Sequence, residues 1–325
     1  MNILINGTGA VGIGLGASMI SQGADVSFFA REETAKAMKE NGVERTGLFK
    51  HWKFSPDRLE VYTDYNEIPK DEFDFVLIAS KTIANDDISQ KLNEHRDILK
   101  KDAKIIIFQN GFANDEPYLR FFSKNQVFCA RVITGFKRPE RHISEITVHT
   151  EPILLGSLQK DDKAGDGRMI SSEPVAIISK MINDSGIPSE TTEHLDRFLW
   201  AKMLYNCALN PLGAILNVNY GKLMENEYSI RIMNRLIEEI FEVIHASGYE
   251  TNWDTPEEYQ EIFYSKLVPD TYNHKSSTLQ DISKRQKTEI DTLNGKVIEL
   301  GEKYGVDVSV NKTIYNIIKT IESDF

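Results

Sequence analysis

The chain has 325 residues, enough for two domains, and its 41% hydrophobic and 27% charged residues are ordinary for a soluble globular protein. The formal net charge of −11 argues against nucleic acid and anionic membrane surfaces as partners, because both require a basic face. The longest apolar runs fall far short of a membrane span, and residues 1–5 are expected to form a strand, not a signal peptide.

The N-terminal elements predict a dinucleotide-binding unit. An apolar strand at residues 3–5 precedes a helix that stops at Gly23 and a second strand at residues 25–31. Between the first strand and the helix lies a G-x-G-x-x-G motif, made of Gly7, Thr8, Gly9, Ala10, Val11 and Gly12. Its glycines allow a tight turn and a close backbone approach, and the helix N-terminus attracts a pyrophosphate. In this context the motif is a strong signal, and the alternative is a glycine-rich turn without a nucleotide.

The end of the second strand bears on the choice of cofactor. An NAD site usually carries Asp or Glu there for the ribose 2′-hydroxyl, whereas this strand ends at Arg31, whose guanidinium suits a 2′-phosphate. Glu32 and Glu33 complicate this assignment, because a carboxylate would repel phosphate, although both also fit the first turn of a helix. The sequence favours NADP(H).

Polar residues follow two further expected strands. Residues 74–80 and 104–108 are nearly continuous apolar runs, typical of a sheet covered on both faces; the first leads to Lys81 and the second to Asn110. Ligands of open α/β sheets bind at the carboxyl ends of the strands, so we expect Arg31, Lys81 and Asn110 to converge with the glycine loop. The structural alternatives are a solvated helix start at Lys81 and a plain turn at Asn110.

The sequence also predicts where the sheet ends. Three more strands are expected, at residues 126–130, 145–149 and 152–155. No helices separate them, which suggests an antiparallel extension of the sheet, followed by a surface loop at residues 156–173. No strand is expected beyond residue 192, so we predict a first domain at residues 1–190 and an all-helical domain at residues 191–325.

A polar ridge marks the first long helix of the second half. Lys202, Asn206 and Asn210 recur at i, i+4 and i+8 within an otherwise apolar segment, so they share one face of a buried helix. Buried polar groups need hydrogen-bond partners, and a buried lysine needs a charge partner, a pKa moved toward neutrality or a ligand. The ridge is either a ligand-facing surface or a structural network between helices. The Asn210–Pro211 pair is expected to end or kink this helix.

Later helices contain a cap and a buried acid. A helix at residues 225–248 is expected to present Glu238, Glu239 and Glu242 to solvent. Ser277 fits the N-cap of a capping box with Gln280. Glu289 falls on an apolar stripe formed by Ile282, Leu293 and Leu300. Three interpretations are open. Glu289 forms an ion pair with Arg285, or the apolar stripe is simply frayed at this position, or the carboxylate faces a cleft and contacts Lys202 or a bound ribose.

Two cysteines and seven histidines complete the set of reactive side chains. Cys129 and Cys207 lie in apolar stretches and are expected to be buried free thiols, and the histidines show no metal-ligand spacing. The sequence therefore predicts a protein of the reducing cytoplasm without a metal site.

These motifs resemble those of the 2-dehydropantoate (ketopantoate) 2-reductase family over nearly the whole chain. The resemblance rests on the glycine motif, Arg31, Lys81 and the run Q-N-G at residues 109–111. It continues with K-M-L-Y-N-C-A-L-N-P-L at residues 202–212 and S-S-T-L-Q-D at residues 276–281. It ends with T-E-I-D at residues 288–291 and N-G at residues 294–295.

The resemblance implies an α/β fold, with an N-terminal Rossmann-type dinucleotide-binding domain followed by an all-helical domain of the 6-phosphogluconate dehydrogenase type. It implies NADPH-dependent reduction of ketopantoate to pantoate, in pantothenate and coenzyme A biosynthesis. Lys202 is then the proton donor, and Glu289 contacts the cofactor and holds the lysine network. Cofactor binding is implied for the glycine motif, Arg31, Lys81 and Asn110. Substrate binding is implied for Asn110, Lys202, Asn206, Asn210 and Ser277.

The chain departs from the family at the substrate end. Gly213 stands where the family often has Thr, and Tyr220 and His274 fall where some members have Asn. A reductase of a different 2-keto acid or of an imine is therefore a second hypothesis. A non-catalytic NADP(H)-binding redox sensor is a third, although a sensor has no use for a proton donor. A homodimer is the default expectation for a soluble oligomer.

Overall fold

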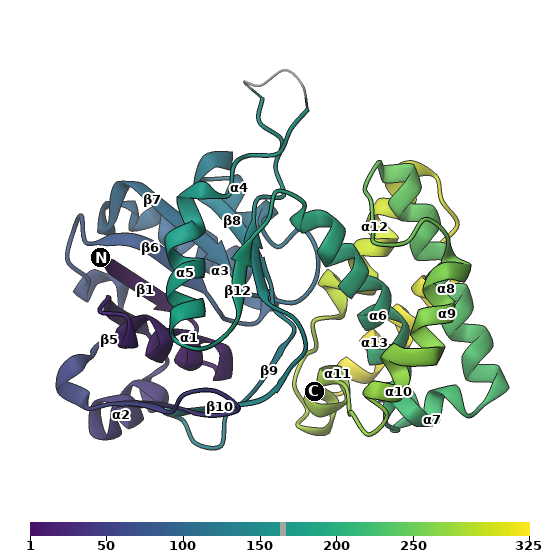
Figure 1. Ribbon diagram of the computed structural model, residues 1–325, viewed down its shortest axis with the longest axis horizontal. Helices are drawn as coiled ribbons and strands as arrows, with labels where there is room; N and C mark the ends of the chain where they lie inside the picture. The colour runs from purple at the N-terminus through teal and green to yellow at the C-terminus, as the bar shows by residue number, and fades with distance from the viewer. Residues whose placement is uncertain (163–166) are drawn as a thin grey trace. The chain divides into compact units, whose positions relative to one another are not determined.

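The computed structural model describes residues 1–162 and 167–325. Packing divides the chain into two compact units: Met1–Gln109 with Asn114–Leu195, and Asn110–Ala113 with Asp196–Phe325. The first is a mixed α/β unit and the second contains only helices, so the predicted fold class is confirmed (Figure 1). No helix in the described residues is long and apolar enough to cross a bilayer.

The first unit is organised around an eight-stranded sheet with the order β12-β11-β8-β7-β6-β1-β2-β5. Its strands are β1 (Asn2–Asn6), β2 (Asp25–Phe29), β5 (Glu60–Tyr62), β6 (Phe73–Ile78), β7 (Leu99–Ile107), β8 (Val127–Arg131), β11 (Ile153–Gly156) and β12 (Ser189–Thr191). All neighbouring pairs are parallel except β8 and β11. The continuous apolar runs of β6 and β7 follow from burial on both faces of a parallel sheet.

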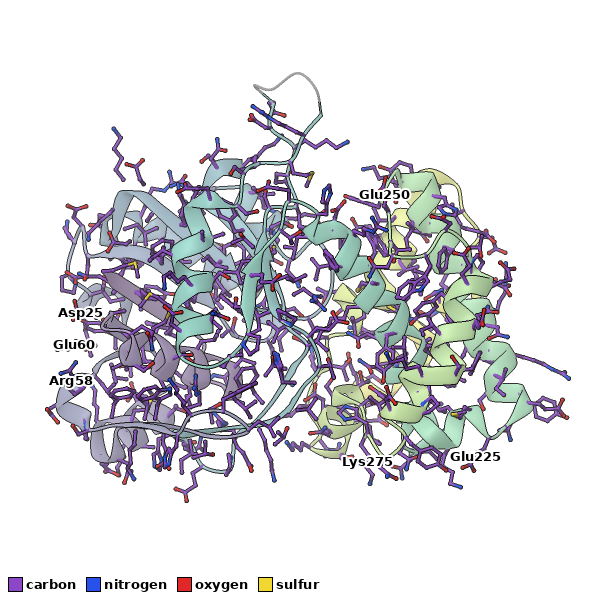
Figure 2. The ribbon with its side chains drawn as sticks, in the orientation of Figure 1. Asp25, Arg58, Glu60, Glu225, Glu250 and Lys275 are labelled. Atoms are coloured by element: carbon purple, nitrogen blue, oxygen red, sulfur yellow. The ribbon has the colours of Figure 1, made fainter. Side chains whose placement is uncertain are left out.

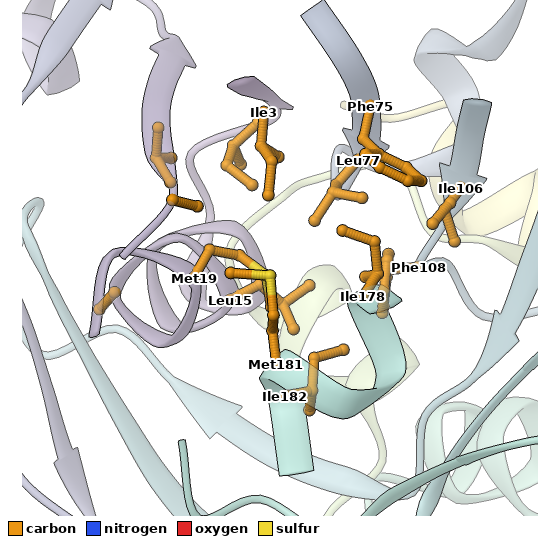
Figure 3. Close-up of a cluster of buried hydrophobic side chains, with 14 of the residues drawn as sticks. Ile3, Leu15, Met19, Phe75, Leu77, Ile106, Phe108, Ile178, Met181 and Ile182 are labelled. Carbon is orange, nitrogen blue, oxygen red and sulfur yellow. The ribbon is translucent and has the colours of Figure 1, made fainter. Parts of the chain in front are cut away.

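Helices cover this sheet, and their apolar side chains pack with those of the strands to form a hydrophobic core. They are α1 (Ala10–Ser21), α2 (Glu32–Asn41), α3 (Asn85–Glu94), α4 (Glu116–Leu119) and α5 (Ala176–Asp184). Figure 3 shows side chains of α1 and α5 packed against those of β1, β6 and β7, among them Leu15, Met19, Ile178, Ile3 and Leu77. The right-handed crossover rule places α3, which connects β6 to β7 in the opposite direction, on the other face of the sheet.

A second sheet corrects the predicted antiparallel extension. It has the order β4-β3-β10-β9, with β3 (Val43–Gly47), β4 (Trp52–Phe54), β9 (Thr134–Lys137) and β10 (Ile143–His149). Only β11 extends the main sheet antiparallel, because β8 continues it in parallel and β10 leaves it. A Cβ at Gly14 of α1 would lie 2.8 Å from Phe136 and Ser144, so this glycine lets the second sheet pack closely on the helix.

Part of the predicted surface loop has regular structure. Lys160 and Met169 form an antiparallel bridge, and Ser157 and Ser172 are buried. The prediction for residues 163–166 lies outside the described residues. Cys129 and Cys207 are free and buried as predicted, and burial raises the pKa of both thiols.

The second unit is a bundle of helices. Its α-helices are α6 (Leu195–Leu216), α7 (Tyr220–Met224), α8 (Glu227–Ser247), α9 (Pro256–Ile262), α10 (Val268–Asp270), α11 (Ser277–Ser283), α12 (Asn294–Tyr304) and α13 (Ser309–Glu322). A π-helical segment, Phe263–Leu267, joins α9 to α10, and a 3₁₀ turn, Ile290–Thr292, precedes α12. These elements confirm an all-helical C-terminal half.

The helix α6 does not end at Pro211, because it continues to Leu216, and the alternative of a kink stays a prediction. Proline has no N–H to donate to the carbonyl four residues earlier, which here belongs to Cys207. The Asn294 side chain replaces that donor, with its Nδ2 bonded to the Cys207 oxygen at 3.2 Å. The helix therefore passes through the proline with its backbone satisfied.

Glu239 is also not on the outer face of α8, because it is fully buried. Its carboxylate accepts from the backbone N–H groups of Val310 and Asn311 and from Asn311 Nδ2, each at 2.9 Å. The Asn311 oxygen in turn accepts from Asn294 Nδ2 at 3.0 Å. A buried polar chain thus links α8, α13 and α12 to the lysine-bearing helix α6.

Candidate active site

The glycine loop lies between β1 and α1 in the first unit. Gly7 has a φ of +105°, and a Cβ there would lie 2.3 Å from the backbone nitrogen of Ser80; a Cβ at Gly12 would lie 1.9 Å from the Gly7 oxygen. A Cβ at Gly9, in contrast, would meet no described protein atom closer than 4.0 Å. The first and third glycines are thus required by the protein's own packing. The second leaves the space that this motif uses for a close approach of pyrophosphate.

Other predicted cofactor residues lie at the same edge of the sheet. Strands β1, β2 and β6 are neighbours and parallel, so the glycine loop, Arg31 after β2 and Lys81 after β6 follow strand ends on one edge. Gln109, after β7, donates to the Ser80 oxygen at 2.9 Å and so ties that strand end to the segment before Lys81. The backbone positions of Arg31 and Lys81 therefore agree with the predicted convergence on the glycine loop.

Asn110 belongs by its contacts to the helical unit. Its Oδ1 accepts a hydrogen bond from Lys202 Nζ at 2.6 Å, and its Nδ2 donates to Glu289 Oε2 at 3.3 Å. An ammonium only donates and a carboxylate only accepts, so the two partners fix the orientation of the carboxamide between them. We call these three residues the lysine network.

Backbone contacts hold Asn110 in the lysine network. Gly111 has a φ of +100°, and a Cβ there would lie 2.6 Å from the oxygens of Thr292. Phe112 donates its backbone N–H to the Thr292 oxygen at 3.1 Å, and its ring lies 4.6 Å from that of Trp200. The glycine after Asn110 is therefore needed for the segment to pack on the turn that carries Glu289.

Glu289 is not on a helical stripe, contrary to the prediction. α11 ends at Ser283 and α12 begins at Asn294, so Glu289 precedes a 3₁₀ turn between them. The carboxylate of Glu322, a buried residue of α13, accepts from the Thr288 backbone N–H at 2.7 Å and from its hydroxyl at 2.6 Å. This pair fixes the residue before Glu289. The apolar periodicity came from residues of two helices with a turn between them.

The predicted substrate ridge lies along α6. Lys202 and Asn206 are partly buried and Asn210 is 4% exposed. Asn210 Oδ1 accepts from the hydroxyl of Tyr220 at 2.5 Å, and the Tyr220 ring lies 5.1 Å from that of His274. Two of the three departures from the family pattern thus contact each other, and one of them, Tyr220, contacts the ridge. Partial burial lowers the pKa of His274.

The predicted N-cap of α11 is displaced by one residue. Ser276, not Ser277, caps the helix, because its Oγ accepts from the Leu279 backbone N–H at 3.0 Å. The same hydroxyl donates to the Asn210 backbone oxygen at 3.0 Å, which ties α11 to the ridge helix. Ser276 is fully buried whereas Ser277 is exposed in the first turn. The adjacent serines gave the sequence no means of deciding between them.

Sequence reasoning did not single out one residue of this region. Arg138, just after β9, donates from Nη1 to the backbone oxygen of Thr8 in the glycine loop at 3.2 Å. No motif marks this arginine, and 130 residues separate it from its partner. Only the packing of the second sheet on α1 brings the two together.

Two family models match the chain. The one described as Ketopantoate reductase PanE/ApbA matches residues 3–160, and the one described as Ketopantoate reductase PanE/ApbA C terminal matches residues 194–322. The first range includes the glycine loop, Arg31, Lys81 and Asn110. The second includes Lys202, Asn206, Asn210, Ser277 and Glu289.

Individual proteins are similar over their full length. The 2-dehydropantoate 2-reductase of Aquifex aeolicus is 32% identical over 322 residues, 99% of this chain and 97% of that protein. The crystal structure of a PanE/ApbA family ketopantoate reductase from Ralstonia eutropha JMP134 has a TM-score of 0.82 at 24% identity, covering 100% of this chain and 99% of that one. D-mandelate dehydrogenase, solved with NADH and anilino(oxo)acetate, has a TM-score of 0.83 at 20% identity with the same coverage. The two structures share the fold.

Proposed function

Because the chain belongs to the ketopantoate reductase family, we propose that it reduces 2-dehydropantoate to pantoate with NADPH, a step toward pantothenate and coenzyme A. The family is one of oxidoreductases with a nicotinamide cofactor and a small keto acid substrate. The lysine network carries the proposal, because it supplies an oriented proton donor in a chain that also has a dinucleotide-type glycine loop.

Groups of the first unit would hold the cofactor. The glycine loop offers N–H groups at the start of α1 to the pyrophosphate, and Arg31 and Lys81 offer positive charge. The space beside Gly9, which no described protein atom closer than 4.0 Å would fill, supports this fit. We assign cofactor contacts to Asn110 and Glu289 as well. When bound, the reduced nicotinamide would supply a hydride to the keto carbon.

Lys202 supplies the proton in the proposed reaction. As negative charge develops on the ketone oxygen, the Lys202 ammonium transfers a proton to it, and solvent later returns one to the amine. Asn110 directs the ammonium through its 2.6 Å bond, and Glu289 keeps the Asn110 oxygen turned toward the lysine. The ammonium thus has a fixed orientation before the reaction begins, which reduces the entropy lost on reaching the transition state.

The substrate is assigned to the ridge and to α11. The Asn210 oxygen already accepts a hydrogen bond from the Tyr220 hydroxyl. A ligand would therefore contact the Asn210 Nδ2, a donor suited to a carboxylate. Asn206 adds a second carboxamide, and Ser277, exposed next to the buried cap Ser276, adds a hydroxyl. Neutral donors of this kind fix a keto acid without placing another full charge beside Lys202.

A second candidate is the reduction of a different 2-keto acid. The contact between Tyr220 and His274, together with Gly213, changes the part of the ridge that would face the substrate's far end. A Cβ at Gly213 would lie 3.3 Å from the Val218 oxygen, so the threonine common in the family would be crowded here. A pocket altered in this way would favour another side chain on the keto acid.

The test is the loss of absorbance at 340 nm with purified protein, NADPH and ketopantoate, run beside NADH and a panel of 2-keto acids. Fast oxidation of NADPH with ketopantoate and slow oxidation with the rest is the expected result. Faster turnover of another keto acid would transfer the assignment to the second candidate. NADPH binding without turnover of any keto acid would refute both. We place the enzyme in the cytoplasm, as a homodimer, which size-exclusion chromatography with light scattering tests.

A further inference from the structure

The hairpin formed by β9 and β10 is fixed against the glycine loop at two points. Arg138 donates to the Thr8 oxygen at 3.2 Å, and Ser144 Oγ donates to the Ala10 oxygen at 2.6 Å. Gly14 permits this approach, because any side chain there would collide with β9 and β10. Residues 138–142 are thus held beside the start of α1 by the packing of a whole sheet.

Three guanidinium groups gather at this place. Burial lowers the pKa of Arg138, and the positive charges of Arg141 and Arg31 lower it further. The three arginines come from two separate parts of the sequence, one after β2 and two from the β9–β10 loop. Like charges in one place repel each other, so the cluster would be stabilised by an anion that neutralises it.

One of the two carboxylates that would repel such an anion is already paired. Arg141 forms an ion pair with Glu33, the second residue of α2. Glu33 is one of the two residues that complicate the assignment of a 2′-phosphate site from the sequence. Its partner comes from a loop more than a hundred positions away, which the sequence could not indicate. This exposed pair contributes little to stability, so its effect is on local charge.

We propose that Arg138 binds the 2′-phosphate of NADPH together with Arg31, and that Arg141 holds the Glu33 carboxylate away from it. The inference rests on the proposed cofactor and adds the residues that would set the preference for NADPH over NADH. A phosphate accepts paired N–H groups from guanidinium forks, whereas the ribose hydroxyl of NADH would gain nothing from them. Arg138 is therefore a specificity residue supplied by the second sheet.

Binding titrations test this without any keto acid. NADPH and NADH are each titrated into the full-length protein, and the fluorescence of the reduced nicotinamide is followed at fixed ionic strength. Arg138→Met keeps the aliphatic stem and removes the charge, and we expect it to weaken NADPH binding by roughly 10- to 100-fold while NADH binding stays unchanged. Arg58→Met is the matched control, because Arg58, labelled in Figure 2, is exposed and comes before Glu60, the first residue of β5. Since β5 is parallel to β2, Arg58 precedes the strand edge opposite to the one that Arg31 follows.

The role of Arg141 has its own cycle of variants. Arg141→Gln unpairs Glu33 and should weaken NADPH binding by roughly threefold to tenfold, and adding Glu33→Gln should restore most of that loss. An equal loss of NADPH and NADH binding in Arg138→Met would mean that the arginine acts through the Thr8 carbonyl, which overturns the proposal. An unchanged ratio of the two affinities would overturn it too. Since the titration contains no substrate, it distinguishes these outcomes even in a protein that is inactive on every keto acid.

Discussion

The glycine loop of the first unit is built from backbone atoms, whereas the lysine network of the second is built from side chains. The loop consists of six consecutive residues, and two of its glycines pack closely against backbone atoms of Ser80 and Gly7. The network is three side chains from segments up to 179 residues apart, joined by hydrogen bonds of 2.6 and 3.3 Å. A substitution in the loop should therefore change backbone packing and cofactor binding, whereas one in the network should change the orientation and transfer of the proton.

The largest expected effect is at Lys202. Lys202→Ala removes the proposed proton donor and should lower turnover by roughly 10²- to 10⁴-fold, with NADPH binding retained. Lys202→Arg keeps the charge but does not release a proton at working pH, so its turnover should also fall. Steady-state kinetics and a binding titration separate the two effects, with Lys303→Ala, an exposed lysine of α12, as the control. Full turnover in Lys202→Ala would remove the assignment.

The next pair of variants contrasts two glycines of the loop. Gly7→Ala forces a side chain into a φ of +105° and against the Ser80 nitrogen, so the free energy of unfolding should fall by roughly 2 kcal/mol or more. A Cβ in Gly9→Ala would lie 4.0 Å from the Ala79 oxygen, an ordinary contact, so the variant should keep its stability within about 1 kcal/mol while NADPH binding weakens at least tenfold. Urea denaturation and nucleotide titration measure both. If Gly9→Ala bound NADPH normally, the space beside it would not be the pyrophosphate site.

Variants of Asn294 test how α6, the helix that carries Lys202, accommodates Pro211. Asn294→Ala leaves the Cys207 carbonyl without its donor and should cost about 1–3 kcal/mol in the free energy of unfolding. Pro211→Ala supplies a backbone N–H four residues after Cys207, so Asn294→Ala should cost less in that background. The double-mutant cycle is measured by urea denaturation. Additive costs would show that Asn294 acts only through Asn311.

The smallest expected effect separates two adjacent serines. Ser276→Ala loses the N-cap of α11 and should lower the free energy of unfolding by about 1 kcal/mol. Ser277→Ala removes an exposed hydroxyl, so stability should not change while KM for the keto acid rises. Thermal unfolding and steady-state kinetics report the two readouts. A stability loss in Ser277→Ala with an unchanged KM would reverse the assignment.

The two regions also differ in how far the sequence predicted them. The glycine loop and the strands β1, β2, β6 and β7 were predicted correctly, because motif, apolar runs and strand ends are local signals. The sequence also named all three residues of the lysine network, by resemblance to a family; their roles stay predictions.

The errors concern signals that are not local. Pro211 does not end its helix because Asn294, far along the chain, supplies the missing donor. Glu239 is buried because backbone groups of α13 satisfy its charge. Glu289 shares a period with residues of two helices by coincidence, and Arg138 reaches Thr8 only through the second sheet. Each error follows from a tertiary partner that composition and spacing do not encode.

The segment Asn110–Ala113 has a consequence for modular exchange between relatives. The helical unit takes these four residues from within the first part of the chain, so it is not a continuous stretch of sequence. A chimaera joined near residue 190 would combine Lys202 and Glu289 of one parent with the Asn110 segment of the other. Gene fusion and fragment complementation would thus need a second, internal graft to transfer the lysine network intact.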